Sequence, residues 1–369
     1  MIRILHVVSS LNINAGMMSV IMNHYRHIDR DRVQFDFLYF EEFAENHMEE
    51  IISLGGRAFY IPYPTFRPSD QKKLHVFFQS HIGEFAAVHC HPIWASEVVA
   101  HEAKRSGIKH IIQHSHSTRF AETKKSEIRN RILLKFIGLF ATDYIACSPE
   151  ASLLFGKKRA RAGSVYILPN AISIDQYAYS ANGRERIRRE FHVDDHTILL
   201  GNVGRLSLTK NQLFAVSVFS EIKKINPNVK MLIVGEGAQK SQIEERICEL
   251  HLSEAVILTG KRKDIRDILS GMDIFLMPSI FEGVPVSAIE AAAAGLPCLL
   301  SDTITRSVDM EGVRYCSLQE NARSWAETAL ALYKDRKFHD RNDNEDVIRH
   351  GFDICTQSEL LENYYLNLR

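Results

Sequence analysis

Short apolar runs alternate with longer segments of helical periodicity along the chain. Residues 2–8 are mostly apolar and lead through a polar turn to a helical pattern over 17–25, and apolar positions over 33–40 then recur at every second residue. Similar short runs follow at 58–61, 87–89, 110–112, 144–146 and 165–168. Strands that alternate with helices predict an α/β fold with a mostly parallel, doubly wound sheet.

A second set of strand-like runs begins after the polar stretch 175–183. Its members are 199–203, 230–234, 255–258, 274–277, 297–300 and 313–315. We therefore expect two Rossmann-like domains facing a cleft, 1–175 and 176–354, which agrees with 369 residues at about 150 per domain. The C-terminal helix, 355–369, could pack on either domain, and one alternative joins it to the first.

Composition narrows the class of protein without naming its chemistry. Hydrophobic residues make up 45% and charged residues 24%, which excludes a disordered chain, and 45 Lys and Arg balance 45 Asp and Glu, which argues against a broadly basic nucleic-acid binder. The beginning of the chain predicts no signal peptide, and no apolar run approaches the roughly 20 residues that span a membrane. Six cysteines without a CxxC pair predict free thiols, and we expect a cytoplasmic protein.

The balanced charge hides a basic segment. Residues 104–161 contain thirteen Lys or Arg and four Asp or Glu, a surplus of nine positive charges that the rest of the chain offsets. A helix over 124–140 would be basic on one side and apolar on the other. The simpler interpretation is a core-facing helix with a solvated back, and the alternative is peripheral docking on anionic lipid head groups at the inner face of the cell membrane.

The segment 278–297, PSIFEGVPVSAIEAAAAGLP, carries the richest chemistry. A strand ends at Pro278, a turn containing Gly283 follows, and a helix is expected near Pro285. Backbone N–H groups around Val284 and Val286 could bind a phosphate there. Glu282 and Glu290 lie before and within this helix, where both carboxylates could accept hydrogen bonds from sugar or ribose hydroxyls.

Two further turns are candidate phosphate sites. Arg205 follows a strand and Lys210 is expected to begin the next helix, so that the two cations could hold a diphosphate and stabilise charge on a leaving group. An ordinary surface Arg and Lys is the competing interpretation. Gly16 stands between the first strand and the first helix, where backbone amides can approach a phosphate.

Metal and dinucleotide sites are also considered. Two histidine pairs, His89 with His91 and His114 with His116, each lie at the end of a predicted strand. Alternation puts both members of a pair on one side of the strand, so that four imidazoles could form a zinc site, although hydrogen-bonding histidines are commoner. The Asp29-Arg30-Asp31 triplet could carry a metal-bound nucleotide but is expected on the far face. Gly235 and Gly237 lack the third glycine of a dinucleotide fingerprint, since residue 240 is Lys.

Several motifs together resemble glycosyltransferase family 4, in the bacterial branch that builds exopolysaccharide, capsule and O-antigen. They are the segment just described with Glu282 and Glu290, GRLSLTKN (204–211), LIVGEGA (232–238), LTGKRKDI (258–265), LPNAISID (168–175), HSH (114–116) and IACSPEA (145–151). The resemblance implies a GT-B fold. It also implies metal-independent transfer with retention of anomeric configuration, from a sugar nucleotide held by the C-terminal domain to an acceptor on the N-terminal domain, with no metal or other cofactor.

The resemblance also implies residue roles. Arg205 and Lys210 match the diphosphate clamp, Glu290 the ribose ligand and Glu282 the ligand of a donor-sugar hydroxyl. The backbone of Lys261 and Arg262 matches the stretch that faces the nucleobase. Either His114 or His116 matches the histidine near the donor sugar. Gly16 and the turn formed by Gly283, Val284, Pro285 and Val286 complete the expected donor site.

The resulting hypothesis is a transferase that moves a hexose or N-acetylhexosamine from a UDP-sugar to a glycan acceptor, carried on a polyprenyl diphosphate, in cell-surface polysaccharide synthesis. No nucleic-acid partner is expected. Two alternatives stay open: a sugar-nucleotide epimerase or hydrolase of the same fold, and an inactive sugar-nucleotide-binding subunit. The identities of the donor sugar, acceptor and linkage, and the oligomeric state, do not follow from the sequence.

Overall fold

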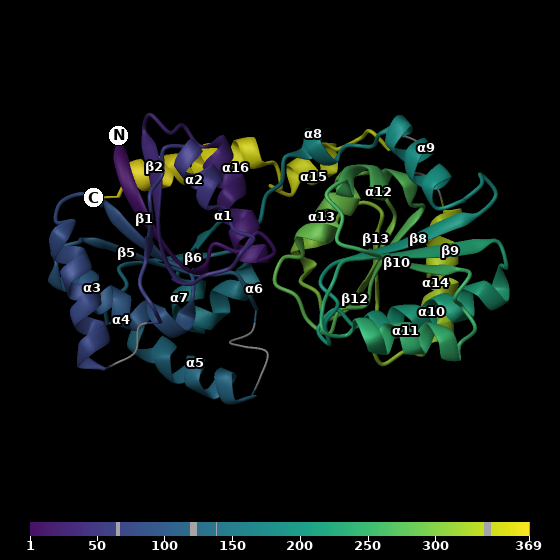
Figure 1. Cartoon of the computed structure of the whole chain (residues 1–369), viewed down its shortest axis with the longest axis horizontal. Helices are drawn as coiled ribbons and strands as arrows, with labels where there is room; N and C mark the ends of the chain where they lie inside the picture. The colour runs from purple at the N-terminus through teal and green to yellow at the C-terminus, as the bar shows by residue number, and fades with distance from the viewer. Residues whose placement is uncertain (64–66, 119–123, 138, 336–340, 369) are drawn as a thin grey trace. The chain divides into compact units, whose positions relative to one another are not determined.

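The computed structural model describes residues 1–63, 67–118, 124–137, 139–335 and 341–368. The chain divides into two compact units, called unit 1 (Met1–Ala171 with Ile354–Arg369) and unit 2 (Ile172–Asp353) (Figure 1). The backbone leaves unit 1 at Ala171, earlier than the expected boundary at 175/176, and the C-terminal helix is part of unit 1. Residues 119–123 and 138, within the predicted basic segment, lie outside the described residues.

Unit 1 is built on a seven-stranded sheet in the order β3-β2-β1-β4-β5-β6-β7, with every pair parallel. Its strands are β1 (Ile2–Ser10), β2 (Val33–Glu41), β3 (Ala58–Tyr60), β4 (Ala87–Cys90), β5 (His110–Ser115), β6 (Asp143–Ala146) and β7 (Tyr166–Ile167). Its helices are α1 (Gly16–His27), α2 (Met48–Ser53), α3 (Pro68–Ser80), α4 (Ile93–Arg105), α5 (Lys124–Ile137), α6 (Pro149–Ser152), α7 (Lys157–Arg161) and α16 (Ile354–Leu366), with a 3-10 turn at Leu153–Phe155.

Two apolar layers cover the sheet of unit 1. One packs α1 and α16 against β1 and β2, where Tyr25, Phe35 and Tyr365 are buried. Figure 1 shows α16, in yellow, beside the purple α1. The other layer packs α3 and α4 against the opposite face through Phe78 and Val99. Both faces are covered, which explains why β2 is buried along nearly its whole length.

Unit 2 is built on a six-stranded parallel sheet in the order β10-β9-β8-β11-β12-β13. Its strands are β8 (Ile198–Val203), β9 (Val229–Val234), β10 (Val256–Gly260), β11 (Ile274–Met277), β12 (Cys298–Ser301) and β13 (Val313–Cys316). Its helices are α8 (Ile174–Tyr177), α9 (Ala181–Glu190), α10 (Gln212–Ile225), α11 (Lys240–Glu249), α12 (Ile265–Gly271), α13 (Val286–Ala293), α14 (Ala322–Lys334) and α15 (Glu345–Arg349), with a 3-10 turn at Arg306–Val308. The two predicted doubly wound sheets are confirmed.

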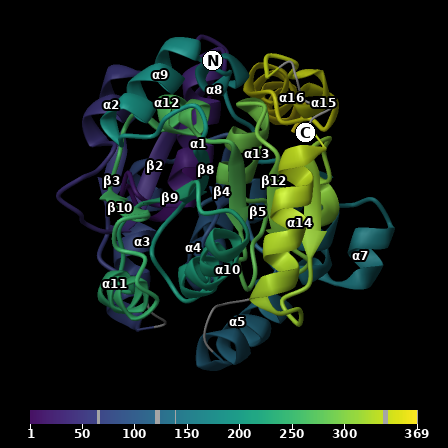
Figure 2. The ribbon, with the colours of Figure 1, turned by 90° about the vertical axis from the view of Figure 1, so that its right-hand side faces the viewer.

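The core of unit 2 is centred on Trp325 of α14, whose side chain is fully buried. Its indole N–H donates a hydrogen bond to the carbonyl oxygen of Ser317 at 2.9 Å, and its ring meets Phe214 of α10 edge to face. Figure 2 shows α14 lying along β12, which it contacts. The indole therefore joins two helices on one face of the sheet.

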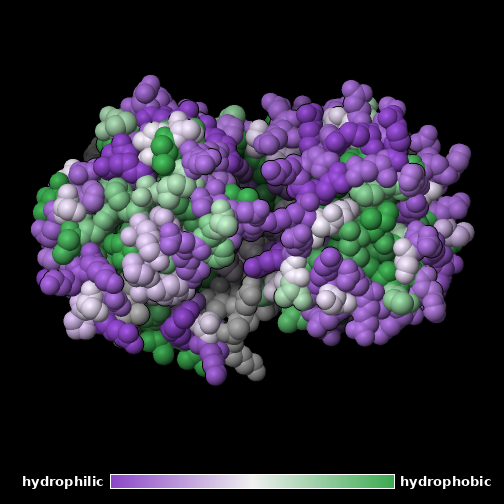
Figure 3. Space-filling view, viewed as in Figure 1, coloured by the Kyte–Doolittle hydropathy of each residue, from purple (hydrophilic) through white to green (hydrophobic). Residues whose placement is uncertain are grey.

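The visible surface of each unit is mainly hydrophilic, with apolar atoms in smaller areas (Figure 3). Among the described residues, no helix combines the length and the apolar character that crossing a bilayer requires. The predicted basic helix begins at Lys124 and ends at Ile137, so Phe140 lies beyond it. All six cysteines are free thiols, as predicted.

Asp36 in the middle of β2 carries a buried charge. Its carboxylate, fully shielded from solvent, accepts hydrogen bonds from the guanidinium groups of Arg3 (2.5 and 2.6 Å) and Arg57 (2.8 Å). Burial alone would raise the pKa of Asp36, but the hydrogen bonds from both arginines outweigh it, and the pKa is lowered from its ordinary value of 3.8. The pairs therefore stabilise the folded state above that value.

Replacing Asp36 by Asn should lower the free energy of unfolding at pH 7 by about 2–3 kcal/mol, because two guanidinium groups lose their charged partner. A carboxyl whose pKa is lowered by folding loses its stabilising effect as the pH falls, so the difference should shrink below pH 4. Urea denaturation at pH 7 and pH 3 measures the difference in free energy of unfolding between the wild-type protein and Asp36→Asn. The exposed Asp31→Asn serves as control, and a difference that is constant with pH would contradict the assignment.

Candidate active site at the switch point of unit 2

The strand order of unit 2 reverses between β8 and β11. From β8 the chain proceeds to β9 and β10 on one side, and from β11 to β12 and β13 on the other, while β8 and β11 pair directly through Leu200 and Ile274. The loops that follow β8 and β11 therefore diverge at the carboxyl edge of the sheet. Ligands of open α/β sheets bind at such an edge.

The two diverging loops hold each other through polar contacts. The N–H of Ile280 donates to the carbonyl oxygen of Thr209 at 2.7 Å, and the side-chain amide of Asn211 donates to the carbonyl oxygen of Pro278 at 3.1 Å. Asn211 itself adopts a left-handed conformation, with φ of 56°, which turns the chain into α10. These contacts fix the backbone on both sides of Lys210.

Lys210 and Glu282 form the central ion pair of the site. Lys210 Nζ lies 2.7 Å from Glu282 Oε1, and the two side chains are 20% and 15% exposed, so the pair is shielded but reachable. Lys210 does not begin the next helix as predicted, because α10 starts at Gln212 and Lys210 lies in the turn before it. Arg205, in the same loop, is exposed.

Glycines let the loops after β8 and β9 approach closely. A Cβ on Gly235 would lie 2.1 Å from the carbonyl oxygen of Gly204, and φ of +137° at Gly235 also disfavours any other residue. The N–H of Gly204 donates to Val234, and that of Leu206 to Glu236, each at 2.9 Å. The aliphatic part of Lys210 passes over Gly204, where a Cβ would meet its Cε at 3.3 Å. Small residues thus leave room for the Lys210 side chain.

Glu290 projects from the second turn of α13, the helix that follows the Glu282 loop. Its carboxyl is removed from solvent, which raises its pKa to about 7 against the smaller lowering effects of a hydrogen bond from Tyr177 and the positive charge of Lys210. Pro285 caps this helix rather than opening its first turn, so the N–H groups of Val286 and Ser287 begin the helix without partners within it. No local sequence pattern indicates Tyr177, which lies in α8.

The other predicted donor residues come from several segments of the chain. Lys261 is exposed after β10, and the Arg262 side chain is engaged by Glu190 (3.0 Å) and Asp264 (2.8 Å), so only the backbone of this stretch could face a ligand. Gly283 and Val284 lie in the loop before α13. Gly16 opens α1 in unit 1, and His114 and His116 belong to unit 1 at the end of β5.

Comparisons with known proteins place the chain in a family. Residues 183–346 match the family described as "Glycosyl transferases group 1". The chain is also 32% identical over 375 residues to the Bacillus subtilis (strain 168) protein named "Putative glycosyltransferase EpsF", covering 98% of this chain and 96% of that one. The chain belongs to the group 1 glycosyltransferases. The prediction that it is a transferase is thereby confirmed.

Two further glycosyltransferases are less similar in sequence. The chain is 22% identical over 327 residues to an Escherichia coli UDP-Gal:alpha-D-GlcNAc-diphosphoundecaprenol alpha-1,3-galactosyltransferase, covering 85% of this chain and 84% of the relative. It is 24% identical over 297 residues to the Staphylococcus aureus capsular polysaccharide biosynthesis glycosyltransferase CapH, covering 76% of each.

A solved structure supports the architecture. Anabaena Alr3699/HepE, crystallised in complex with UDP and glucose, superposes with a TM-score of 0.83 at 17% identity over all of both chains. At this identity the likeness concerns the fold. Together with the two parallel sheets, it confirms the predicted GT-B class for this glycosyltransferase.

The pKa of Glu290 offers a test of the site geometry. Replacing Tyr177 by Phe should raise this pKa above 7, because the hydroxyl no longer donates to the carboxylate form. The titration of the protonated carboxyl band in infrared difference spectra, identified by its loss in Glu290→Gln, measures the change. Tyr179→Phe removes a neighbouring hydroxyl as control, and an unchanged midpoint in Tyr177→Phe would show that the two side chains do not interact.

Proposed function

We propose that this glycosyltransferase moves a hexose or N-acetylhexosamine from a UDP-sugar to a lipid-linked glycan acceptor, with retention of configuration, in the synthesis of a cell-surface polysaccharide. The observation that carries the proposal is the Lys210–Glu282 pair beside Arg205 at the switch point of unit 2. A cation and an acceptor of hydrogen bonds at one place suit a ligand that joins a diphosphate to a sugar.

The chemistry assigns a role to each charged group. As the bond between the sugar and the diphosphate breaks, negative charge grows on the departing UDP, and Arg205 and Lys210 stabilise it. Glu282 accepts a hydrogen bond from a donor-sugar hydroxyl and Glu290 from the ribose. Lys210 pairs with Glu282, so the diphosphate would share this cation with the carboxylate, which also accepts the hydrogen bond from the sugar hydroxyl.

Further groups complete the proposed donor site. The first N–H groups of α13 bind a phosphate oxygen, since the helix start concentrates unpaired donors there. The backbone of Lys261 and Arg262 faces the nucleobase, Gly16 lets backbone amides approach a phosphate, and His114 or His116 contacts the donor sugar. A departing phosphate oxygen takes the proton of the acceptor hydroxyl, so the reaction needs no second flanking carboxylate of the kind that glycosidases use.

The relatives support this choice of substrates. The name of the E. coli relative specifies UDP-Gal as donor and a GlcNAc-diphosphoundecaprenol acceptor, and that of CapH places it in capsular polysaccharide biosynthesis. The HepE structure holds UDP and glucose. An epimerase or hydrolase of the same fold would need no glycan acceptor, so product analysis with and without acceptor separates these reactions. An inactive binding subunit would bind UDP-sugars without turnover.

Replacing Arg205 or Lys210 by Ala should lower kcat by about a hundredfold or more, because each removes charge that stabilises the departing diphosphate. The turnover number is measured as transfer of labelled sugar to an undecaprenyl-diphosphate-linked GlcNAc, with each of a panel of UDP-sugars as donor. Lys240→Ala, an exposed lysine of the same unit, should retain wild-type turnover. Wild-type turnover in Arg205→Ala or Lys210→Ala would refute the diphosphate clamp, and loss of turnover in EDTA restored by Mg²⁺ or Mn²⁺ would refute metal-independent transfer.

Peripheral membrane association is proposed for the basic segment 104–161. In the described part of α5, Ile128 and Ile132 are 63% and 52% exposed, and Arg129 and Arg131 are exposed beside them. Such a face suits the head-group region of an anionic bilayer, where each nearby Lys or Arg contributes about 1 kcal/mol.

We expect the protein to sediment with vesicles containing phosphatidylglycerol but not with neutral phosphatidylcholine vesicles, and binding should weaken at high salt. Replacing both Ile128 and Arg131 by Ser should lower the bound fraction severalfold, whereas the matched pair Ile225→Ser and Lys224→Ser on α10 should not. Equal sedimentation with both kinds of vesicle, or with neither, would contradict the proposal.

A further inference from the structure

Five imidazoles gather at the carboxyl edge of the unit 1 sheet, where the strand order reverses between β1 and β4. They come from three neighbouring strands: His6 from the middle of β1, His89 and His91 from the end of β4 and the residue after it, and His114 and His116 from the end of β5 and the residue after it. All but the part-buried His116 are at most 5% exposed. The two His-x-His pairs of the sequence indicate four of these residues, and no sequence pattern indicates His6.

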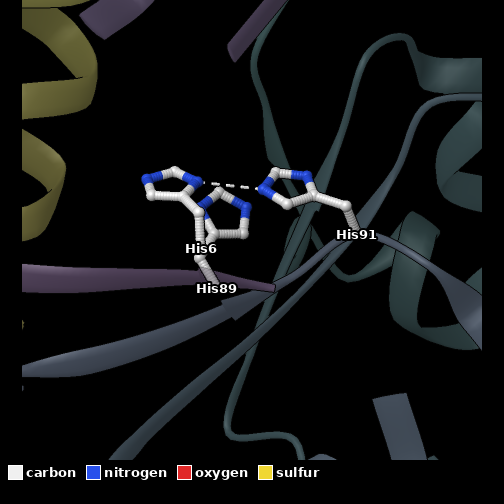
Figure 4. Close-up of side chains that lie close together, drawn as sticks. All are labelled: His6, His89 and His91. Carbon is white, nitrogen blue, oxygen red and sulfur yellow. Dashed lines mark hydrogen bonds between the residues drawn. The ribbon is translucent and has the colours of Figure 1, made fainter. Parts of the chain in front are cut away.

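The imidazoles are joined by ring-nitrogen contacts. Figure 4 shows His6 and His91 meeting beside His89, with His6 Nδ1 lying 3.0 Å from His91 Nε2. His91 Nδ1 lies 2.8 Å from His116 Nε2. In a second line, His89 Nε2 lies 3.1 Å from His114 Nδ1, and His89 Nδ1 lies 2.6 Å from the hydroxyl of Tyr365 on α16.

His114 Nε2 is buried and, like His6 Nε2 and His116 Nδ1 in the same cluster, has no hydrogen-bond partner among the described residues, although an unpaired buried polar atom costs about 1–3 kcal/mol. One ring nitrogen of His114, one of His91 and one of His116 all lie within 4.8 Å of one another. An atom that lacks a partner beside two other imidazoles has the placement of a metal ligand.

We propose that His91, His114 and His116 bind one divalent transition-metal ion of the Zn²⁺ class. The ligand atoms are His91 Nδ1, His116 Nε2 and His114 Nε2. Zinc–nitrogen bonds of about 2.0–2.1 Å in a tetrahedral site separate neighbouring nitrogens by about 3.3 Å. The 2.8 Å contact between His91 and His116 therefore opens by about half an ångström when the ion replaces their hydrogen bond.

The second layer of side chains supports this ligand set. A ligating imidazole is usually oriented by a hydrogen bond at its other nitrogen. His91 Nε2–H donates to His6 Nδ1 and His114 Nδ1–H to His89 Nε2, and Tyr365 contacts His89 in turn. With the ion on His114 Nε2, the hydrogen of the neutral imidazole lies on Nδ1, which donates to His89 Nε2, and His89 Nδ1–H then donates to the Tyr365 hydroxyl oxygen.

The chemistry of the cluster selects the ion. His91 and His114 are buried and His116 is part-buried, so the three imidazoles are shielded from bulk water. The set has no carboxylate, and imidazole nitrogens prefer Zn²⁺, Ni²⁺, Co²⁺ or Cu²⁺ to Mg²⁺ or Ca²⁺. Three protein ligands leave the fourth position open, and the part-buried His116 marks the side from which an ion enters.

This site does not include the proposed diphosphate clamp of unit 2, but it does include His114 and His116, one of which is proposed above to contact the donor sugar. The test therefore measures binding. Full-length protein stripped with EDTA and dialysed is titrated with Co²⁺, followed by its visible d–d absorption, and Zn²⁺ is then added as competitor. We expect one equivalent of Co²⁺ to bind, with intense bands typical of low coordination, and to be displaced by Zn²⁺.

Variants locate the site. His114→Gln and His116→Gln should each weaken Co²⁺ binding by about a hundredfold or more, and His89→Gln should weaken it by about 10- to 100-fold because it leaves the ligands in place but removes an orienting partner. His196→Gln, which removes an exposed imidazole of unit 2, is the matched control and should bind as the wild type does.

Two results would overturn the proposal: no stoichiometric Co²⁺ binding by the wild-type protein, or wild-type affinity in both His114→Gln and His116→Gln. Circular dichroism of each variant shows whether it folds. If a variant does not fold, X-ray absorption at the zinc edge of the wild-type protein decides, since three imidazole ligands support the site and a shell of oxygen ligands excludes it.

Discussion

Parallel strands must be joined by crossovers, and this constraint determines where both units can offer chemistry. Each crossover runs through a helix on one face of the sheet and returns to a neighbouring strand. Successive strands are therefore added on one side of the first strand, and after the strand order reverses they are added on its other side. In unit 2 the reversal falls between β8 and β11, and the loops leaving these strands turn away from each other. Lys210 and Glu282 meet across this gap because the sheet cannot fill it.

The same constraint produces a different environment in unit 1. There the reversal lies between β1 and β4, and the side chains at the strand ends are imidazoles rather than carboxylates and ammonium groups. Charged groups stay half-shielded in pairs in unit 2, whereas burial keeps the imidazoles of unit 1 neutral. One topology thus supports a charged site in one unit and an uncharged, electron-rich site in the other.

Local patterns predicted the strands and the site loops, since period-two alternation and Gly-containing turns depend on neighbouring residues. What the sequence could not show depends on distant residues. Tyr365 contacts His89 across 276 positions, and His6 contacts His91 across 85. Lys210 was expected to begin a helix. Asn211 instead adopts a left-handed conformation, and α10 begins only at Gln212. The hydrogen bond from Tyr177 to Glu290 likewise joins segments that no local pattern connects.

The chain passes from one unit to the other twice, at Ala171–Ile172 and at Asp353–Ile354, and the two passages are tied by a hydrogen bond from the Ile172 N–H to the Phe352 carbonyl oxygen at 2.9 Å. Unit 1 is therefore discontinuous in the gene. An N-terminal fragment ending at residue 171 would lack Leu361 and Tyr365, which are buried in its core, and would leave the sheet face beneath α16 exposed. Unit 2 is the continuous piece, so a designer who wishes to exchange it between relatives can cut at these two adjacent points and insert a single segment.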